Sequence, residues 1–395
     1  AAIYMAAKNG LQCALMAPTE ILAEQHYRSL APLLEPLGIP CALLTASTKA
    51  RERRALNERL RSGELSLVIG THALLSPDVQ YQNLGLVVTD EQHRFGVDQR
   101  AALSAKGDDP HLLVMSATPI PRTLALMIYG DLDVSILNEL PPGRQKIDTF
   151  AVPSSYHERI YAFLRKLVAE GRQAYIVCPM VSENDELPDE RKAVTAYAEM
   201  LQKEVFPDLR IAPIHGKMKP KEKDAVMRAF AAHEIDVLVS TTVIEVGVDV
   251  PNATVMVIEN GERFGLAALH QLRGRVGRGS VSGTCLVMTH SKGNGGASAA
   301  QDRLQSLEKT SDGFTLAQMD LRLRHEGEIL GYRQHGGVTL RFVDLDADEK
   351  LIEWAHLDAV DLLRYACNLD SVATRPLRDA VAMRYRHIFK EVSGG

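Results

Sequence analysis

This 395-residue sequence has little of what marks several specialised classes of protein. Cysteine is rare and scattered, with no CxxC pair, so neither a disulfide framework nor a zinc site is expected, and this usage is typical of a reducing cytoplasm. No uninterrupted apolar run is long enough to span a bilayer and no signal peptide is recognisable, so we expect no membrane association. The formal net charge of −5 gives no whole-chain signal for nucleic acid, although a local basic groove can still bind phosphates. The cysteines are Cys13, Cys41, Cys178, Cys285 and Cys367.

The phosphate-cradling pattern GxxxxGK[ST] does not occur either. Its nearest fragment, HGKM at 215–218, lacks the upstream glycine and the hydroxyl, and without such a loop no backbone N–H groups and no lysine hold the β- and γ-phosphates of a nucleotide. The chain opens AAIYMAAKNG, which reads as the last turns of a helix with Asn9-Gly10 as its stop. A domain seldom starts within a helix, so we expect a truncated N-terminus.

Short apolar runs alternate with helical patterns along most of the chain. This alternation, with 46% hydrophobic and 24% charged residues, favours a globular α/β fold in which helices cover parallel sheets. Expected strands are 12–16, 41–44, 65–69, 86–89, 111–115, 173–178, 210–214, 236–240, 254–258 and 284–288. Expected helices include 20–34, 49–61, 193–205 and 221–233.

Two turn-rich stretches divide the pattern. LPPGRQK at 140–146 predicts a linker, and SKGNGGAS at 291–298 predicts a flexible connector. We therefore expect a first lobe at 1–140, a second lobe at 146–290 and a helical tail at 299–395. The two lobes could be distant copies of one fold.

Asp90 and Glu91 follow the apolar run LVVT at the expected end of a buried strand. An aspartate in this place can hold magnesium through its water shell, and a neighbouring glutamate can orient the attacking water in phosphoryl transfer. The plainer alternative is a strand that ends in exposed acids. HLLVMSAT offers Ser116 and Thr118 at the end of another strand, and parallel strand ends gather on one edge, so these hydroxyls could meet Asp90. Alone, the SAT tripeptide indicates a turn.

The second lobe ends in HQLRGRVGRG at 270–279. Arg275 and Arg278 are three residues apart, so they share a helix face or a turn, and fixed arginines stabilise a transferring phosphoryl group. The alternatives are a solvated basic loop, which includes Arg273, or a contact with DNA phosphates. VSTTVIEVGVDVP at 239–251 places polar residues after another strand, although a plain strand–loop–strand explains it equally well.

In this order the strings resemble a superfamily 2 helicase core: APTEILAEQH (17–26), IGTHALL (69–75), DEQH (90–93), SAT (116–118), TTVIEVGVD (241–249) and QLRGRVGR (271–278). The longer strings DEQHRFG and MSATPIPRTLALMIYGDLDVS are similar to RecG, the family of ATP-dependent DNA helicases that branch-migrate DNA in bacteria. DGFTLAQMDLRLRHEGEILGYRQHG (312–336) is similar to the translocation element of that family. The resemblance covers residues 10–340 and implies two RecA-like lobes.

The resemblance also implies a role for each matching residue. Asp90 binds Mg²⁺, Glu91 is the general base and His93 couples the lobes. Gln271, Arg275 and Arg278 face the γ-phosphate of ATP, with Gly247 and Asp249 lining the nucleotide. DNA-backbone contacts fall on Thr19, Thr71, His72 and Thr241, and coupling falls on Ser116, Thr118, Arg322, Arg324 and Gln334.

For the whole protein, the resemblance implies a monomeric ATP hydrolase acting on branched or forked double-stranded DNA in recombination and repair, with single-strand-binding protein as a further partner. In the family the phosphate loop opens the helix before ALMAPTE, so here it falls just before residue 1, and a wedge domain that engages branched DNA is absent. The first strand of the sheet is expected to be lost as well. We therefore expect these residues alone to hydrolyse ATP barely or not at all.

Two departures and several rivals stand beside this interpretation. The family's LRGPGE reads LRHEGE at 323–328, and Gln318 replaces a common acid, which puts the efficiency of translocation in doubt. The transcription-repair coupling ATPase shares the core and the tail element, a non-enzymatic DNA-binding module is a rival of another class, and an RNA helicase is a third possibility.

Overall fold

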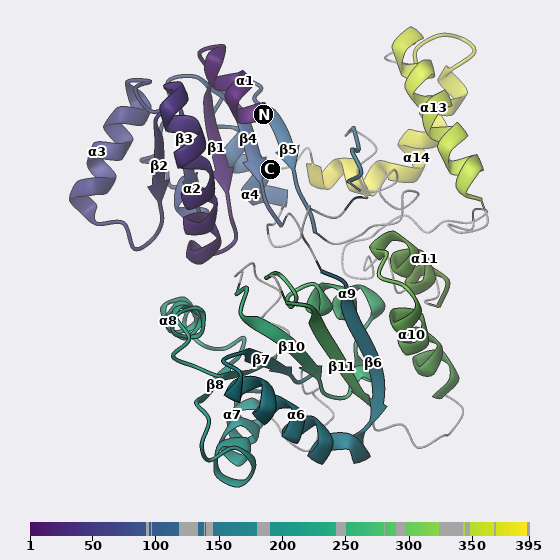
Figure 1. Ribbon diagram of the computed structural model, residues 1–395. Helices are drawn as coiled ribbons and strands as arrows, with labels where there is room; N and C mark the ends of the chain where they lie inside the picture. The colour runs from purple at the N-terminus through teal and green to yellow at the C-terminus, as the bar shows by residue number, and fades with distance from the viewer. Residues whose placement is uncertain are drawn as a thin grey trace. The chain divides into compact units, whose positions relative to one another are not determined.

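The computed structural model describes residues 1–395 except 92–94, 96, 118–132, 138, 140–144, 180–189, 242–249, 280, 290–296, 324–342, 344–347, 367–368 and 393–395. The chain divides into two compact units. The first unit (1–118, 142–264 and 268–292) contains both sheets, and the second (119–141, 265–267 and 293–395) contains the C-terminal helices (Figure 1).

The first sheet is parallel throughout its described strands. They are ordered β2-β3-β1-β4-β5, and each neighbouring pair runs in the same direction. The strands are β1 (Gln12–Met16), β2 (Cys41–Leu44), β3 (Leu67–Gly70), β4 (Leu84–Thr89) and β5 (His111–Val114). Helix α1 (Ala2–Lys8) precedes β1, and the helices between the strands are α2 (Glu20–Leu34), α3 (Ala50–Arg61) and α4 (Val97–Ser104).

The second sheet is also parallel, in the order β6-β11-β10-β7-β9-β8. Its strands are β6 (Ile147–Pro153), β7 (Gln173–Val177), β8 (Ile211–Ile214), β9 (Val237–Ser240), β10 (Ala253–Ile258) and β11 (Gly283–Thr289). Its helices are α6 (His157–Ala169), α7 (Glu190–Met200), which continues as a π-helical turn (Leu201–Val205), α8 (Pro220–Ala231) and α9 (Leu266–Arg273).

The second unit is helical. It contains α10 (Ala297–Lys309), α11 (Gly313–Leu323), α13 (Glu349–Tyr365) and α14 (Arg375–Val392). Leu304 and Leu307 of α10 and Leu316 of α11 are buried. Across the part of the chain that the structure describes, no helix combines the length and apolarity needed to cross a membrane.

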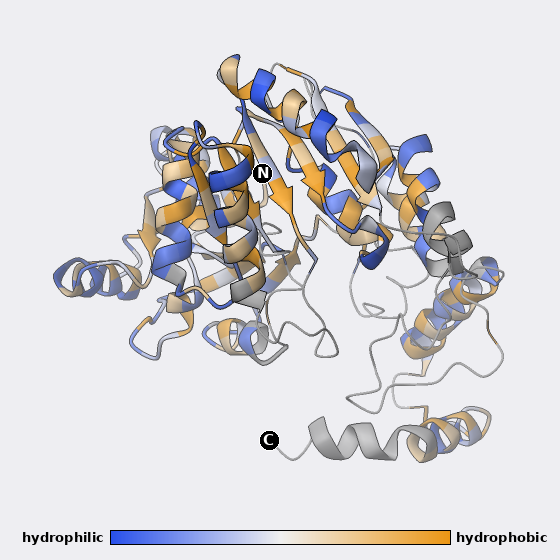
Figure 2. Ribbon diagram, turned by 90° about the horizontal axis from the view of Figure 1, so that it is seen from below, coloured by the Kyte–Doolittle hydropathy of each residue, from blue (hydrophilic) through white to orange (hydrophobic). Residues whose placement is uncertain are grey.

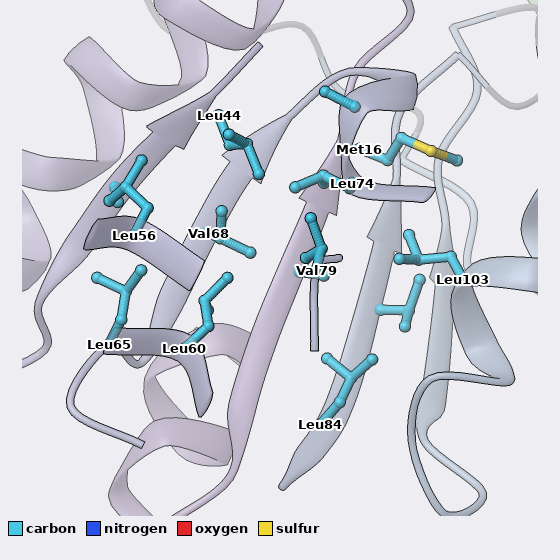
Figure 3. Packing of buried hydrophobic residues seen from close by; sticks show 14 residues of the cluster. Met16, Leu44, Leu56, Leu60, Leu65, Val68, Leu74, Val79, Leu84 and Leu103 are labelled. Carbon is cyan, nitrogen blue, oxygen red and sulfur yellow. The ribbon is translucent and has the colours of Figure 1, made fainter. Parts of the chain in front are cut away.

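Apolar side chains fill both faces of each sheet, which is why the central strands read as continuous apolar runs. Every residue of β1 is buried. On one face of the first sheet Met16, Leu44 and Val68 pack with Leu56 and Leu60 of α3 (Figure 3). The strands of both sheets are predominantly hydrophobic, whereas the helices carry mixed faces (Figure 2).

The predicted strands are confirmed with shifts of one or two residues at their ends, and the tandem α/β lobes with a helical tail are confirmed as the fold class. Strand β3 begins at Leu67 rather than Leu65, and the helix expected at 193–205 begins at Glu190. The sequence prediction missed β6 and the helices α4, α6 and α9. Strand β6 is an edge strand that alternates between partly buried and exposed residues, so it lacks the apolar run by which its neighbours were found.

The two sheets repeat one plan. Without β6, the order β8-β9-β7-β10-β11 matches β2-β3-β1-β4-β5 strand for strand. The central strands β1 and β7 each follow a helix that ends at a glycine with left-handed φ, Gly10 at 76° and Gly171 at 79°. Helices α3 and α8 both start after a lysine with φ −62° and ψ 145°. The expectation that the lobes are copies of one fold therefore has structural support.

A buried glutamine begins each central strand and ties the amino edge of its sheet together. Gln12 Nε2 donates to Leu60 O (2.9 Å) and Leu65 O (2.8 Å), while its Oε1 accepts from Gln82 N (2.7 Å) and Asn83 N (3.0 Å). In the second sheet, Gln173 Nε2 donates to the carbonyls of Phe230 and Ile235, both at 2.7 Å. Leu60 O also accepts from Gly63 N and Gln82 N, and Phe230 O accepts from His233 N. The amides therefore add to these turns, and they supply a side-chain partner for Leu65 O, Asn83 N and Ile235 O.

We predict that Gln12→Ala lowers the free energy of unfolding by about 2–4 kcal/mol, because Leu65 O and Asn83 N lose the side-chain partner that the structure gives them. Urea unfolding followed by circular dichroism measures the change. Gln80→Ala, at an exposed position, is the matched control and should stay within about 0.5 kcal/mol of the parent. Equal effects of the two substitutions would show that the amide bonds are not what holds this edge.

Candidate functional site

The carboxyl ends of β1, β4 and β5 are held in register at one edge of the first sheet. Asp90 N donates to Met16 O at 3.0 Å, and Met115 N donates to Thr89 O at 2.8 Å. Ser116 follows Met115 on the neighbouring strand and is exposed. Because parallel strands point the same way, the first residues after them collect on this edge.

The Asp90 carboxylate is fixed by two hydrogen bonds. Its Oδ1 accepts from Glu91 N at 2.9 Å, and its Oδ2 lies 2.8 Å from Nε2 of His26 on α2. The two side chains of this pair are 24% and 18% exposed for His26 and Asp90, so solvent still reaches them. An ionised carboxylate only accepts hydrogen bonds, so His26 Nε2 carries the proton.

Glu91 has φ of 52°, in the left-handed region that side chains other than glycine rarely adopt. Such strained residues cluster at functional sites, where the surrounding structure holds them. Here the backbone of Asp90 is fixed to β1 while the Glu91 residue is buried. The turn therefore directs two adjacent carboxylates to different surroundings.

The arginine segment follows α9 as a turn rather than a helix face, since α9 ends at Arg273. Gln271 and Arg278 are partly buried and Arg275 is buried. Arg278 Nε donates to Gly274 O at 3.0 Å. Gly277 has φ of 69° and lies so close to Gly283 that a Cβ would fall 3.1 Å from its nitrogen, so a glycine is needed to seat the turn against β11.

Arg273 has a structural place within the second sheet's lobe. It is buried, and its Nη2 donates to His270 Nδ1 at 2.8 Å. Burial lowers the pKa of its guanidinium. This setting differs from the solvated basic loop that the sequence left open.

The described unit brings Arg275 beside Glu91. Arg275 Nη2 lies 4.0 Å from Glu91 Oε1, and the two side chains are 8% and 10% exposed. Glu91 follows β4 of the first sheet, whereas Arg275 lies in the turn after α9 in the second sheet's lobe. The two oppositely charged side chains are therefore close together although they are far apart in sequence, and both are buried. At this separation the attraction is strongest where water is excluded.

The four threonine and histidine positions predicted to contact DNA have different settings. Thr19 is the N-cap of α2, its Oγ1 accepting from Leu22 N at 3.3 Å. His72 is exposed. Thr71 and Thr241 occupy matching positions after β3 and β9, both buried, with hydroxyls that have no hydrogen-bond partner. Their roles stay predictions.

Several predicted residues lie outside the described residues: His93, Thr118, Gly247, Asp249, Arg324 and Gln334. Arg322 lies in α11, but its side chain is outside the described part.

The sequence prediction missed His26, which is the last residue of the string APTEILAEQH. It also missed a polar cluster at the corresponding edge of the second sheet. There Glu259 follows β10, and its carboxylate accepts from Tyr197 OH at 2.8 Å and contacts His157 Nε2 at 3.2 Å. For His26, the available signal was a single histidine in the helix at 20–34. No local pattern in the sequence identifies Asp90 as its partner.

Comparison with known proteins shows what the chain is similar to. The family model described as "DEAD/DEAH box helicase" matches residues 1–127, and "Helicase conserved C-terminal domain" matches residues 158–280. The ATP-dependent DNA helicase RecG of Synechocystis sp. is 49% identical over 387 residues, which cover 98% of this chain and 46% of that protein. The same-named protein of Bacillus subtilis is 47% identical over 362 residues, covering 92% of this chain and 52% of that protein.

This chain belongs to the RecG family. The family expected from the sequence is thereby confirmed. The structure of a RecG bound to a three-way DNA junction matches with a TM-score of 0.73 and 46% identity, over 89% of this chain and 45% of that chain. The helicase Lhr of Mycobacterium smegmatis, at 17% identity and a TM-score of 0.54, shows the RecA-like fold alone. The present chain spans about half the length of the RecG relatives it matches, at 46% and 52%.

We predict that Glu91 and Arg275 are energetically coupled. In a double-mutant cycle of Glu91→Gln and Arg275→Met, the coupling in the free energy of unfolding should be about 1 kcal/mol, because both charges are desolvated. The exposed pair Arg59–Glu64, with nitrogen and oxygen 2.9 Å apart, is the control and should show less than about 0.5 kcal/mol in urea unfolding. Coupling no larger than that of the control would contradict the contact.

Proposed function

We propose that this chain is the motor of an ATP-dependent DNA helicase and translocase that remodels branched DNA, through fork regression and branch migration, in recombination and repair. The observation that carries the proposal is the desolvated Arg275 beside Glu91. A guanidinium from the second sheet's lobe lies beside the carboxylate predicted to orient water in the first. Phosphoryl transfer between two lobes needs charge from both of them near one phosphate, and this contact supports such a site.

The residues at the edge of the first sheet fit a hydrated magnesium ion. Mg²⁺ keeps several waters and takes one or two protein carboxylates together with substrate phosphates, and Asp90 offers one fixed, partly exposed carboxylate. Within the described ranges no group of three or more His, Cys, Asp or Glu is placed to hold a metal ion, so the fit rests on Asp90 together with water and phosphate ligands. Bound Mg²⁺ would neutralise charge that develops on the phosphates.

In the proposed reaction Asp90 would hold the metal, and Glu91 accepts a proton from the attacking water. Arg275, with Gln271 and Arg278, stabilises charge on the transferring phosphoryl group. The Arg275–Glu91 contact keeps this glutamate engaged until a nucleotide competes for the guanidinium. His93, Gly247 and Asp249 are proposed, on family resemblance, to couple the lobes and to line the nucleotide.

The internal repeat supports a place for a phosphate-binding segment in the proposed motor. Strand β11 is flanked by β6, whereas its counterpart β5 ends the first sheet and leaves Leu112 and Leu113 exposed at 37% and 41%. In the second sheet the first residue of α6, His157, touches Glu259, the counterpart of Asp90. A segment that paired with β5 and entered α1 would likewise bring a helix start, which binds phosphate, toward Asp90.

For DNA we propose contacts with the sugar-phosphate backbone, which position a duplex without reading its sequence. His72 is exposed and Thr19 partly exposed, so both can be approached from solvent. For Thr71 and Thr241 the proposal now involves the backbone around the residue, since both side chains are buried. Coupling by Ser116, Thr118, Arg322, Arg324 and Gln334 rests on the family resemblance.

The proposed setting is a monomer in the cytoplasm, with branched DNA and single-strand-binding protein as partners. The proposed division is a first lobe at 1–140, a second at 146–290 and a translocation element with a tail at 299–395. The name of the junction-bound relative supports the choice of branched DNA.

The test is magnesium-dependent ATP hydrolysis, with and without a three-way DNA junction, by these 395 residues and by the complete product of the gene. We predict activity, stimulated by the junction, for the complete product alone, because the 395 residues contain no phosphate-cradling loop. A helicase-like rate from the 395 residues would contradict the need for that loop. No hydrolysis by either protein would favour a non-enzymatic DNA-binding module.

In the complete product, Arg275→Ala should lower kcat about 10²–10³-fold, as the loss of one charge-stabilising donor does. Arg275→Lys should restore little of it, since an ammonium lacks the planar donor fork. Arg61→Ala, at an exposed end of α3, is the control and should keep the parental kcat. An Arg275→Ala protein with unchanged kcat would refute the role given to this arginine.

Hydrogen exchange tests the pairing at β5. We predict that amides of Leu112 and Leu113 exchange more slowly in the complete product than in the 395-residue chain, because a paired or covered edge opens less often. The amides of β8, at an edge of the second sheet, serve as the internal control. Equal protection of β5 in the two proteins would place the phosphate-binding segment elsewhere.

A further inference from the structure

His26 is a polar side chain at the proposed site to which neither the family resemblance nor the sequence strings assign a role. It lies in the second turn of α2, whose first turn is capped by Thr19. Its Nε2 reaches Asp90 Oδ2 at 2.8 Å across 64 residues of sequence. This contact joins the helix after β1 to the turn after β4.

The contact leaves the carboxylate able to bind something more. A carboxylate has about four lone-pair sites on its two oxygens. Two of them are used, by Glu91 N on Oδ1 and by His26 Nε2 on Oδ2. Both torsions of the aspartate are thereby restrained, while 18% of its side chain stays exposed, so the remaining sites face a position that water or a hydrated ion can occupy.

The second sheet repeats the arrangement with a different outcome. Glu259 N donates to Val177 O at 2.8 Å, as Asp90 N does to Met16 O. The helix after β7 supplies Tyr197, whose OH donates to the Glu259 carboxylate, and α6 adds His157 from a further side. Glu259 is 7% exposed. Burial and the nearby Glu259 charge raise the pKa of Tyr197, so its hydroxyl remains a donor.

The two sheets share one hydrogen bond at this edge but differ in how exposed the carboxylate is. In both sheets the helix after the central strand donates one hydrogen bond to the carboxylate that follows the neighbouring strand. In the second sheet additional donors close the carboxylate off. In the first sheet His26 is the one side-chain donor that the described hydrogen bonds give to Asp90, and the carboxylate stays open.

We propose that His26 is a positioning residue: its Nε2–H holds the Asp90 carboxylate in the orientation that receives the hydrated magnesium ion of the bound nucleotide. The proposal rests on the proposed function, since it assigns the orienting group of the same site. Groups that orient a metal-binding carboxylate typically change metal affinity or activity about 10–100-fold when removed.

The experiment measures Mn²⁺ affinity by electron paramagnetic resonance in the presence of ADP, together with the Mg²⁺ dependence of ATP hydrolysis, on the complete gene product. His26→Leu removes the donor, whereas His26→Gln places an amide N–H near the position of Nε2. We predict that His26→Leu weakens Mn²⁺ binding and raises the half-saturating Mg²⁺ concentration about 10–100-fold. His26→Gln should stay within about threefold of the parent if a single N–H donor is what Asp90 needs.

Two controls separate positioning from packing. Tyr197→Phe removes the corresponding hydrogen bond in the second sheet and should lower thermal stability without changing Mn²⁺ affinity. His111→Ala, an exposed residue at the opposite end of β5, should change neither. KM for DNA should be unaffected by His26→Leu, since the loss is confined to the metal site.

The possible results divide cleanly between the two proposals. Mn²⁺ affinity unchanged in His26→Leu would overturn the role of His26 and leave the motor function standing. Equal losses of affinity and thermal stability in His26→Leu and His26→Gln would overturn it too, and would make His26 a packing residue. A parent protein that binds no Mn²⁺ with ADP and hydrolyses no ATP would overturn the proposed function itself.

Discussion

The backbone hydrogen bond from Asp90 to Met16 is the constraint on which the site depends. This bond fixes Asp90 at the carboxyl edge of the first sheet, and the chain then turns at Glu91, which has a left-handed backbone conformation. One carboxylate is then held by α2 through His26, and the next is buried beside Arg275. Parallel strands make this possible because their carboxyl ends share an edge, so short connections from different helices converge there.

The internal repeat explains how one fold serves two roles. A carboxylate follows β4 in the first sheet and β10 in the second. In each sheet the helix after the central strand, β1 or β7, supplies a side chain that donates a hydrogen bond to this carboxylate. Tyr197 and His157 contact the Glu259 carboxylate, which is almost completely buried. The second sheet's lobe contributes Arg275 from the turn after α9 to the candidate site. The first sheet leaves Asp90 open. A difference of a few side chains therefore separates an enclosed carboxylate in the second sheet from a candidate metal site in the first.

The sequence predicted most strands because residues buried on both sheet faces produce apolar runs. It missed β6, an edge strand whose alternating exposure hides it. Asp90 and Glu91 were visible as acids after an apolar strand, and the arginine turn as a cluster of arginines and glycines. The pairing of His26 with Asp90 and of Arg275 with Glu91 was not, since each joins segments far apart in the chain. Such contacts follow from the tertiary packing of helices and turns and leave no local period.

If the two lobes supply one phosphoryl-transfer site, a structure of the complete gene product with ADP, magnesium and a planar phosphate mimic should show it. We expect Arg275 to lie within hydrogen-bond distance of the mimic and away from Glu91, and Asp90 to lie beside the metal. A nucleotide bound elsewhere, with the Arg275–Glu91 contact intact, would contradict this expectation.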